Sequence, residues 1–135
     1  MRRHVYEGAE ILWVDDRPSN NRNESRMLRS FGALITFAAT TDEAQEALKV
    51  ASSQVRPFHI ILSDISRDLP PPPDTGAGLK MLATFRAQGI SLPLIFYVGQ
   101  PKPGAATPDG AFGITNRPDV LLTLVGDALA QGRGA

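Results

Sequence analysis

Short apolar runs rich in strand-forming residues alternate along the chain with longer segments whose apolar residues recur at helical spacing. This alternation is typical of an α/β domain with a mainly parallel sheet. Five runs have the length of strands, and they cover residues 11–15, 33–38, 59–63, 92–98 and 112–115. We therefore expect five strands, with helices in the intervals that carry the second pattern.

Four segments carry the helical pattern, at residues 18–32, 40–53, 77–88 and 118–130. Pro18 suits the first turn of the first helix, and Gly32 suits its C-terminal end. Thr40 precedes Glu43 by three residues, which is the capping-box spacing expected where the second helix begins. In the third segment, the residues expected to face the core are Leu79, Leu82 and Phe85.

Two segments interrupt the alternation. Residues 66–78 contain four consecutive prolines, which cannot join a helix or a central strand and favour an extended polyproline conformation. A stiff surface loop is the favoured interpretation there, and a docking segment for an aromatic groove is the alternative. Residues 99–110 contain three prolines and three glycines where an α/β domain should have another helix, so we expect a turn or loop.

Composition narrows the classes of protein to consider. The chain has 135 residues and is 42% hydrophobic, which is enough for one core, so we expect a single domain over residues 1–135. Fourteen basic residues balance fourteen acidic ones, which disfavours binding to nucleic acid or to an anionic membrane. The absence of cysteine excludes disulfides and thiolate chemistry. The N-terminal stretch does not resemble a signal peptide and no apolar run approaches the ~18 residues that span a bilayer, so we expect a cytoplasmic protein.

Three aspartates follow predicted strands. Asp15 and Asp16 end the first run, and Asp64 follows the third. If these strands are neighbours in a parallel sheet, the three carboxylates meet at one edge, where ligands of α/β sheets gather. Their mutual repulsion favours a bound cation, and a site built only from oxygen ligands suits Mg²⁺. The alternative is that these aspartates only cap helices and begin loops, but an adjacent pair with a third favours the metal site.

These motifs together resemble the receiver domain of two-component response regulators. The segment "ILWVDD" is similar to that family's first strand with its acidic pair, and "IILSDI" to the strand that ends in the phospho-accepting aspartate. The segment "GLKML" resembles the start of the third helix, and "NRP" stands where the family usually has Lys-Pro. The resemblance spans about residues 10–130. It implies a doubly wound, flavodoxin-like parallel sheet of five strands in the order 2-1-3-4-5.

The resemblance also implies the roles of individual residues. Asp15 and Asp16 become the acidic pair, Asp64 becomes both a metal ligand and the phospho-acceptor, and Ser66 offers its backbone carbonyl to Mg²⁺. The implied phosphoryl donor is a sensor histidine kinase or a phosphotransfer protein. The implied function is signal transduction in a phosphorelay, by a signalling module rather than by an enzyme.

Several positions depart from the family pattern. Val98 stands where the family has a switch threonine or serine, and it lacks the hydroxyl that would bind a phosphoryl oxygen. Arg117 replaces the family's lysine, so a broad guanidinium replaces a compact ammonium, and it could still pair with Asp64 or a phosphate. Ile114 replaces the switch aromatic, and the fourth helix is degraded at residues 99–110. We therefore expect an atypical receiver.

Two other functions stay open. The first is a pseudo-receiver that binds a protein partner through residues 66–78 or 99–110 and does not depend on phosphorylation. The second is a magnesium-dependent phosphohydrolase, which is disfavoured because Asp15 is not part of a D-x-D motif. Whether two copies of the chain form a homodimer is also open.

Overall fold

The computed structural model describes residues 3–99 and 106–133. They contain one sheet of five parallel strands in the order β2-β1-β3-β4-β5. The strands are β1 Glu10–Val14, β2 Leu34–Ala38, β3 Ile60–Ser63, β4 Leu94–Tyr97 and β5 Gly113–Thr115. The five predicted strands and their order are confirmed, and their ends differ from the predicted ends by at most two residues.

β1 lies between β2 and β3, and the register of these strands places the ends of β1 and β3 side by side. Val14, the last residue of β1, pairs with Ser63, the last residue of β3. The residues that follow, Asp15 and Asp64, therefore leave the sheet at the same edge. Helices cover both faces of a parallel sheet, so its buried strands consist of nearly continuous apolar residues.

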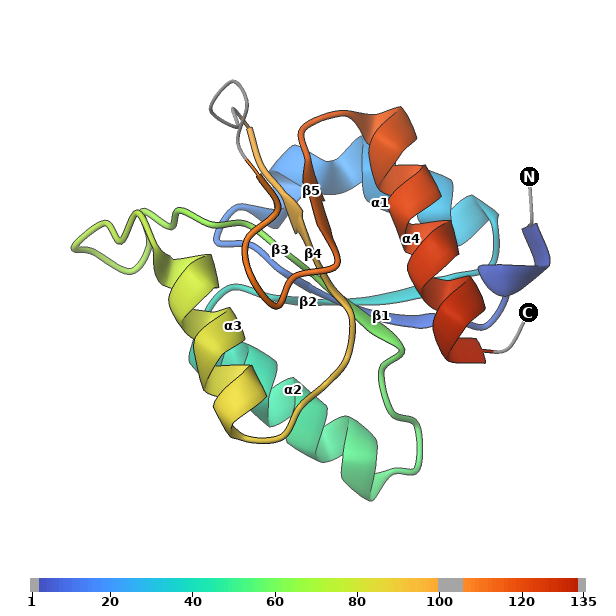
Figure 1. Ribbon diagram of the computed structural model, residues 1–135, viewed down its shortest axis with the longest axis horizontal. Coiled ribbons are helices and arrows are strands. Elements are labelled where there is room, and N and C mark those ends of the chain that lie inside the picture. The colour runs from blue at the N-terminus through green and yellow to red at the C-terminus, as the bar shows by residue number, and fades with distance from the viewer. Residues whose placement is uncertain (1–2, 100–105, 134–135) are drawn as a thin grey trace.

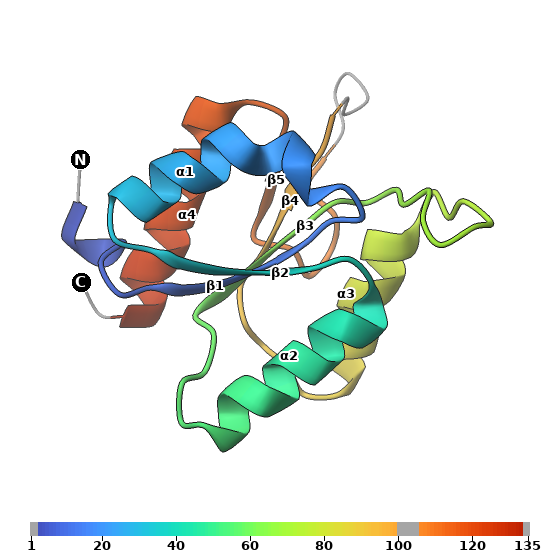
Figure 2. The same ribbon diagram turned by 180° about the vertical axis from the view of Figure 1, so that it is seen from behind.

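Helices cover both faces of the sheet. Figures 1 and 2 show α1 and α4 on one face and α2 and α3 on the other. The helical elements are η1 Arg3–Val5, η2 Pro18–Asn21, α1 Arg22–Ser30, α2 Thr41–Ser53, α3 Ala77–Ala87 and α4 Pro118–Arg133. Each predicted helix has its counterpart, although the first begins as the 3₁₀ turn η2, which contains Pro18.

The predicted signals at helix ends are confirmed. Gly32 follows α1 with a φ of +98°, a backbone conformation that L side chains rarely adopt. The Thr40 hydroxyl accepts a hydrogen bond from the backbone N–H of Glu43 at 3.1 Å, and a Glu43 carboxylate oxygen accepts one from the N–H of Ala39 at 3.0 Å. The start of α2, which borders the site described below, is therefore well anchored.

One core prediction is wrong. Leu79 was expected to face inward from α3, but 41% of it is exposed. The buried face of α3 instead follows the spacing of Ala77, Met81 and Phe85, with Leu82 beside them. The buried face of α3 is therefore rotated relative to the predicted one, so that Leu79 lies outside it.

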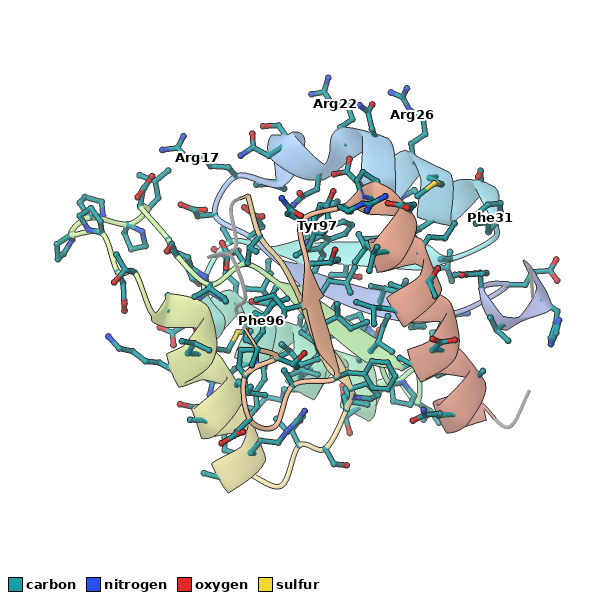
Figure 3. All side chains as sticks on the ribbon, turned by 45° about the horizontal axis from the view of Figure 1, so that its top comes forward. Arg17, Arg22, Arg26, Phe31, Phe96 and Tyr97 are labelled. Atoms are coloured by element: carbon teal, nitrogen blue, oxygen red, sulfur yellow. The ribbon has the colours of Figure 1, made fainter. Side chains whose placement is uncertain are left out.

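Two apolar cores lie on opposite faces of the sheet. Two neighbouring residues of β4 belong to different cores. Phe96 packs in the core beneath α2 and α3, whereas Tyr97 packs against the core beneath α1 and α4. Figure 3 shows these two side chains. Trp13 is fully buried in the second core, stacked on Phe37 at 5.8 Å and edge-on to Tyr97 at 6.1 Å between ring centroids.

The connection between β4 and β5 contains no helix in its described part. Residues 106–110 form coil and a turn, as predicted, and residues 100–105 of the predicted loop lie outside the described residues. Within residues 3–99 and 106–133, none of the helices combines the length and the apolar character needed to cross a membrane.

Candidate functional site

The three predicted aspartates come together at the carboxyl edge of the sheet. Asp15, Asp16 and Asp64 each have a carboxylate oxygen within 4.8 Å of the others. Backbone hydrogen bonds fix their places, because the N–H of Asp15 donates to Ala38 at 2.9 Å and that of Asp64 donates to Val14 at 3.1 Å. Asp15 is 8% exposed and Asp64 is 7% exposed. Two of the three carboxylates are thus largely withdrawn from water.

Hydrogen bonds orient the acidic pair. One oxygen of Asp15 accepts from the backbone N–H of Arg17 at 2.8 Å, and the other accepts from the side-chain amide of Asn21 at 2.9 Å. Oδ2 of Asp16 accepts from the backbone N–H groups of residues 68 and 69 at 2.8 and 3.2 Å. The carboxylate of Asp16 therefore ties the site to the loop that follows β3.

A buried arginine, Arg67, lies against Asp64. Its Nε donates to Oδ1 of Asp64 at 2.9 Å, and only 6% of the arginine is exposed. Its Nη1 donates to the hydroxyl of Thr41 at 2.8 Å, and its Nη2 lies 3.5 Å from both the Ser63 hydroxyl and the Met81 sulfur. The sequence analysis did not select this residue. One feature of the sequence could have indicated its role: Arg67 is the cationic residue nearest to Asp64 along the chain.

Burial dominates the electrostatics of the site. It raises the pKa of Asp64 to about 6, although the neighbouring guanidinium of Arg67 acts in the opposite direction. Burial also raises the pKa of Asp15, and the charge of Asp16 adds to this, whereas hydrogen bonds from Arg17 and Asn21 oppose it. A raised carboxyl pKa means that the site favours the uptake of a proton or of another cation.

The loop after β3 closes on itself beside this site. Arg67 and Asp74 exchange both backbone hydrogen bonds, at 2.8 and 2.7 Å, and form an isolated antiparallel bridge. Between them, residues 68–73 form the exposed loop that the sequence predicts, but the backbone bends at residues 69–72, so the expected extended polyproline conformation is wrong. We call residues 68–73 the proline loop. Ser66 is exposed and donates its hydroxyl to the carbonyl of Thr75 at 3.2 Å, and the role of its own carbonyl stays a prediction.

Gly78 approaches Asp64 from the start of α3. Its N–H donates to the carbonyl of Ile65 at 2.8 Å, and its α-carbon faces the backbone of Asp64. A Cβ at this position would collide with the carbonyl oxygen of Asp64 and would lie 2.9 Å from the α-carbon of Ile65. The glycine therefore allows α3 to pack directly against the site.

Within residues 3–99 and 106–133, no hydrogen bond or ion pair joins Asp64 to the residues at the family's switch positions. Arg117 forms an ion pair with Asp119 at 3.0 Å, with 68% of its side chain exposed, so its pairing with Asp64 or a phosphate stays a prediction. Val98 and Ile114 are half-buried and pack against the core beneath α2 and α3. Asp64 has its cationic partner in Arg67 instead.

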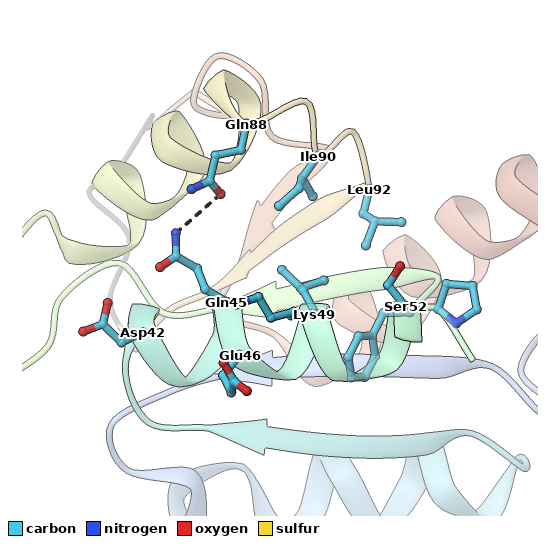
Figure 4. A pocket seen from close by; sticks show the side chains of 11 residues that line it. Asp42, Gln45, Glu46, Lys49, Ser52, Gln88, Ile90 and Leu92 are labelled. Carbon is cyan, nitrogen blue, oxygen red and sulfur yellow. Dashed lines mark hydrogen bonds between the residues drawn. The ribbon is translucent and has the colours of Figure 1, made fainter. Parts of the chain in front are cut away.

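Two hollows border α2, and Asp42 near the start of this helix lines both. One of about 760 Å³ is lined by the proline loop, by Thr41 at the start of α2, and by Arg67. The other, of about 670 Å³, lies near the amino ends of β3 and β4 between Leu48, Phe58 and Ile90, with Gln45 and Gln88 hydrogen-bonded across it at 3.4 Å (Figure 4). Only the first hollow borders the aspartate site.

Solved structures of receiver domains share this fold. A receiver domain protein from Clostridium thermocellum matches with a TM-score of 0.68 and 17% identity over 93% of this chain and 97% of that chain. The chemotaxis response regulator CheY4 of Vibrio cholerae matches with a TM-score of 0.61 and 23% identity over 90% and 98%. The response regulator TrrA of Thermotoga maritima, solved with Mg²⁺ and BeF, matches with a TM-score of 0.64 and 18% identity over 89% and 98%. No family model and no curated protein matches the sequence.

The chain therefore has the fold of response regulator receiver domains, as its motifs indicate. At these identities the likeness establishes the fold, and the activity has to be argued from the site itself.

Proposed function

We propose that the chain is an atypical receiver that accepts a phosphoryl group on Asp64, with Mg²⁺ held by Asp15, Asp16, Asp64 and the backbone carbonyl of Ser66. The observation that carries the proposal is the meeting of three carboxylates within 4.8 Å at the carboxyl edge of a receiver-type sheet. The donor would be a sensor histidine kinase or a phosphotransfer protein.

The donor set fits a hard divalent cation. All of its ligands would be oxygens, and no histidine or cysteine belongs to the described cluster. Burial raises the pKa of Asp15 and of Asp64 because it disfavours their ionised forms. A cation that replaces the proton would stabilise these ionised carboxylates. When bound, Mg²⁺ would supply charge neutralisation and orientation for phosphoryl oxygens.

The chemistry required of the chain itself is limited. An oxygen of Asp64 attacks the phosphorus of a phosphohistidine donor, and the new O–P bond forms as the P–N bond breaks. The electron pair of the broken bond leaves with the imidazole nitrogen, which then takes a proton. The bonds from Arg17 and Asn21 keep Asp15 in place during this exchange.

Incubation with Mg²⁺ and a small phosphodonor should add the mass of one phosphoryl group to the intact protein. Asp64→Asn removes the nucleophilic oxygen and should abolish the added mass. Asp109→Asn, a change at an exposed aspartate in the turn before β5, serves as the matched control and should label like the wild type. Equal labelling of the Asp64 variant, or no labelling of the wild type, would refute the proposal.

A second function, the pseudo-receiver, is favoured by one contact. Arg67 already supplies Asp64 with a buried cationic partner at 2.9 Å, so the pair could serve only to hold the loop after β3. In that case the chain would bind a protein partner equally well with or without Mg²⁺ and phosphodonor. The labelling experiment above separates the two functions.

The affinity for Mg²⁺ should fall with acidification. With the pKa of Asp64 at about 6, protons compete with the metal for this carboxylate, and the apparent affinity near pH 5 should be roughly tenfold weaker than near pH 7.5. Calorimetric titration at both pH values measures this difference. An affinity that does not change between them would show that Asp64 is already ionised at the lower pH or does not bind the metal.

A further inference from the structure

We propose that Arg67 binds the phosphoryl group on Asp64 and passes its presence to the start of α2 and to the proline loop. This inference rests on the proposed function, because it concerns the modified state of the same aspartate. In this proposal, the residue that transmits the effect of phosphorylation is Arg67 in the loop after β3. It takes the place of Val98 and Ile114 at the family's switch positions.

The contacts of one guanidinium group carry the inference. Its Nε holds Asp64 at 2.9 Å, and its Nη1 holds the hydroxyl of Thr41, the first residue of α2, at 2.8 Å. Within residues 3–99 and 106–133, Arg67 is the cationic side chain that lies within ion-pair distance of Asp64. A single rigid group thus connects the acceptor to a neighbouring helix.

The backbone of the same residue closes the proline loop. Arg67 exchanges two backbone hydrogen bonds with Asp74, whose carboxylate in turn accepts from the N–H of Gly76 and from the ammonium of Lys80 in α3. At the start of the loop, the carboxylate of Asp16 accepts hydrogen bonds from the backbone N–H groups of residues 68 and 69. Both ends of the proline loop are therefore bonded to residues of the site.

A phosphoryl group would change the balance of these contacts. The phosphoryl group carries about −1.5 to −2 of charge, which replaces the single negative charge of the Asp64 carboxylate, and it brings three acceptor oxygens beside a guanidinium that has several donors in a fixed plane. The guanidinium would turn from Asp64 and Thr41 towards the new oxygens. That movement releases the Thr41 hydroxyl and pulls on the backbone bridge to Asp74, and both line the hollow of about 760 Å³.

The residues at the other switch positions are poorly placed for this role. Val98 and Ile114 have no polar side-chain atom, so neither can hydrogen-bond a phosphoryl oxygen. The guanidinium of Arg117 is engaged by Asp119 at 3.0 Å. The surface that changes should consequently be the one formed by α2 and the proline loop.

The test follows backbone amide signals by NMR as Mg²⁺ is added first and beryllofluoride, a phosphoryl mimic, second. In the wild type, the second addition should shift the signals of Thr41 and Asp74. In Arg67→Met both shifts should be lost, while the signals of residues 15, 16 and 64 still report that the mimic binds. Arg26→Met, a change at an exposed arginine of α1, is the matched control and should keep both shifts.

Thr41→Val provides a second variant that leaves the acidic site intact, which is useful if Arg67→Met does not fold. It should lose the shift at position 41 and keep the shift at Asp74, because only the hydroxyl contact is removed. Retention of both shifts in Arg67→Met, or their absence in a wild type that binds the mimic, overturns the role of Arg67 and leaves the proposed function standing. A wild type whose site signals ignore the mimic overturns both.

Discussion

Gly78→Ala should destabilise the fold by more than the roughly 1–3 kcal/mol that overpacking of a core usually costs. The added Cβ would collide with the carbonyl oxygen of Asp64 and would lie 2.9 Å from the α-carbon of Ile65. Both neighbours are backbone atoms, which cannot move aside as the end of a flexible side chain can. Either α3 must shift away from the sheet, or β3 must move together with Asp64. Urea unfolding followed by circular dichroism measures the loss.

Gly76→Ala is the matched control, two residues away in the same segment. A Cβ there would meet only the carboxylate oxygen of Asp74, at 3.9 Å, which is an ordinary contact. Gly76 precedes α3 with a φ of −122°, which any residue can adopt, so the change should cost less than about 1 kcal/mol. If the two alanine variants are equally stable, α3 does not pack on Asp64 as closely as the structure indicates.

The meeting of the three aspartates could be predicted from the sequence because it depends on strand order alone. Two apolar runs end in acidic residues, and parallel strands that are neighbours end at the same edge of the sheet. The register of Val14 with Ser63 then brings Asp15 and Asp64 together without any long-range detail. The helix caps were predictable for a similar reason, since Thr40 and Glu43 interact within one turn.

The burial of Arg67 could not be predicted in this way. It depends on the closure of the loop by the bridge to Asp74 and on the packing of Met81 from α3, contacts that no local pattern encodes. An arginine followed by an aspartate, a leucine and four prolines is typical of a solvated loop. Leu79 shows the opposite error, because an apolar residue in a helical pattern turned out to be 41% exposed. The first case was decided by tertiary contacts of the loop after β3, and the second by the face through which α3 packs on the sheet.

Arg67→Met should lower the free energy of unfolding by about 3–5 kcal/mol near pH 7.5, because it leaves the charge of Asp64 buried without a partner. The cost should shrink near pH 5. A carboxyl whose pKa is raised in the folded state contributes stability that is present below its unfolded pKa and lost as the pH rises through its folded pKa, about 6 for Asp64. Without the guanidinium this folded pKa rises further, so the variant goes on losing stability to a higher pH than the wild type does, and the difference between the two proteins grows as the pH rises. Urea unfolding of both proteins across this range measures the difference.

Adding Asp64→Asn to Arg67→Met separates charge from packing. If the buried charge causes the loss, the double variant should recover most of the stability near pH 7.5 and should lose the part of the pH dependence that Asp64 causes, because asparagine has a similar shape and no charge. A cost that is the same at every pH and persists in the double variant would show that Arg67 acts through its bonds to Thr41 and its contact with Met81. Recovery would instead identify the Asp64 and Arg67 pair as a charge balance within the fold, which is the condition for an added phosphoryl group to disturb it.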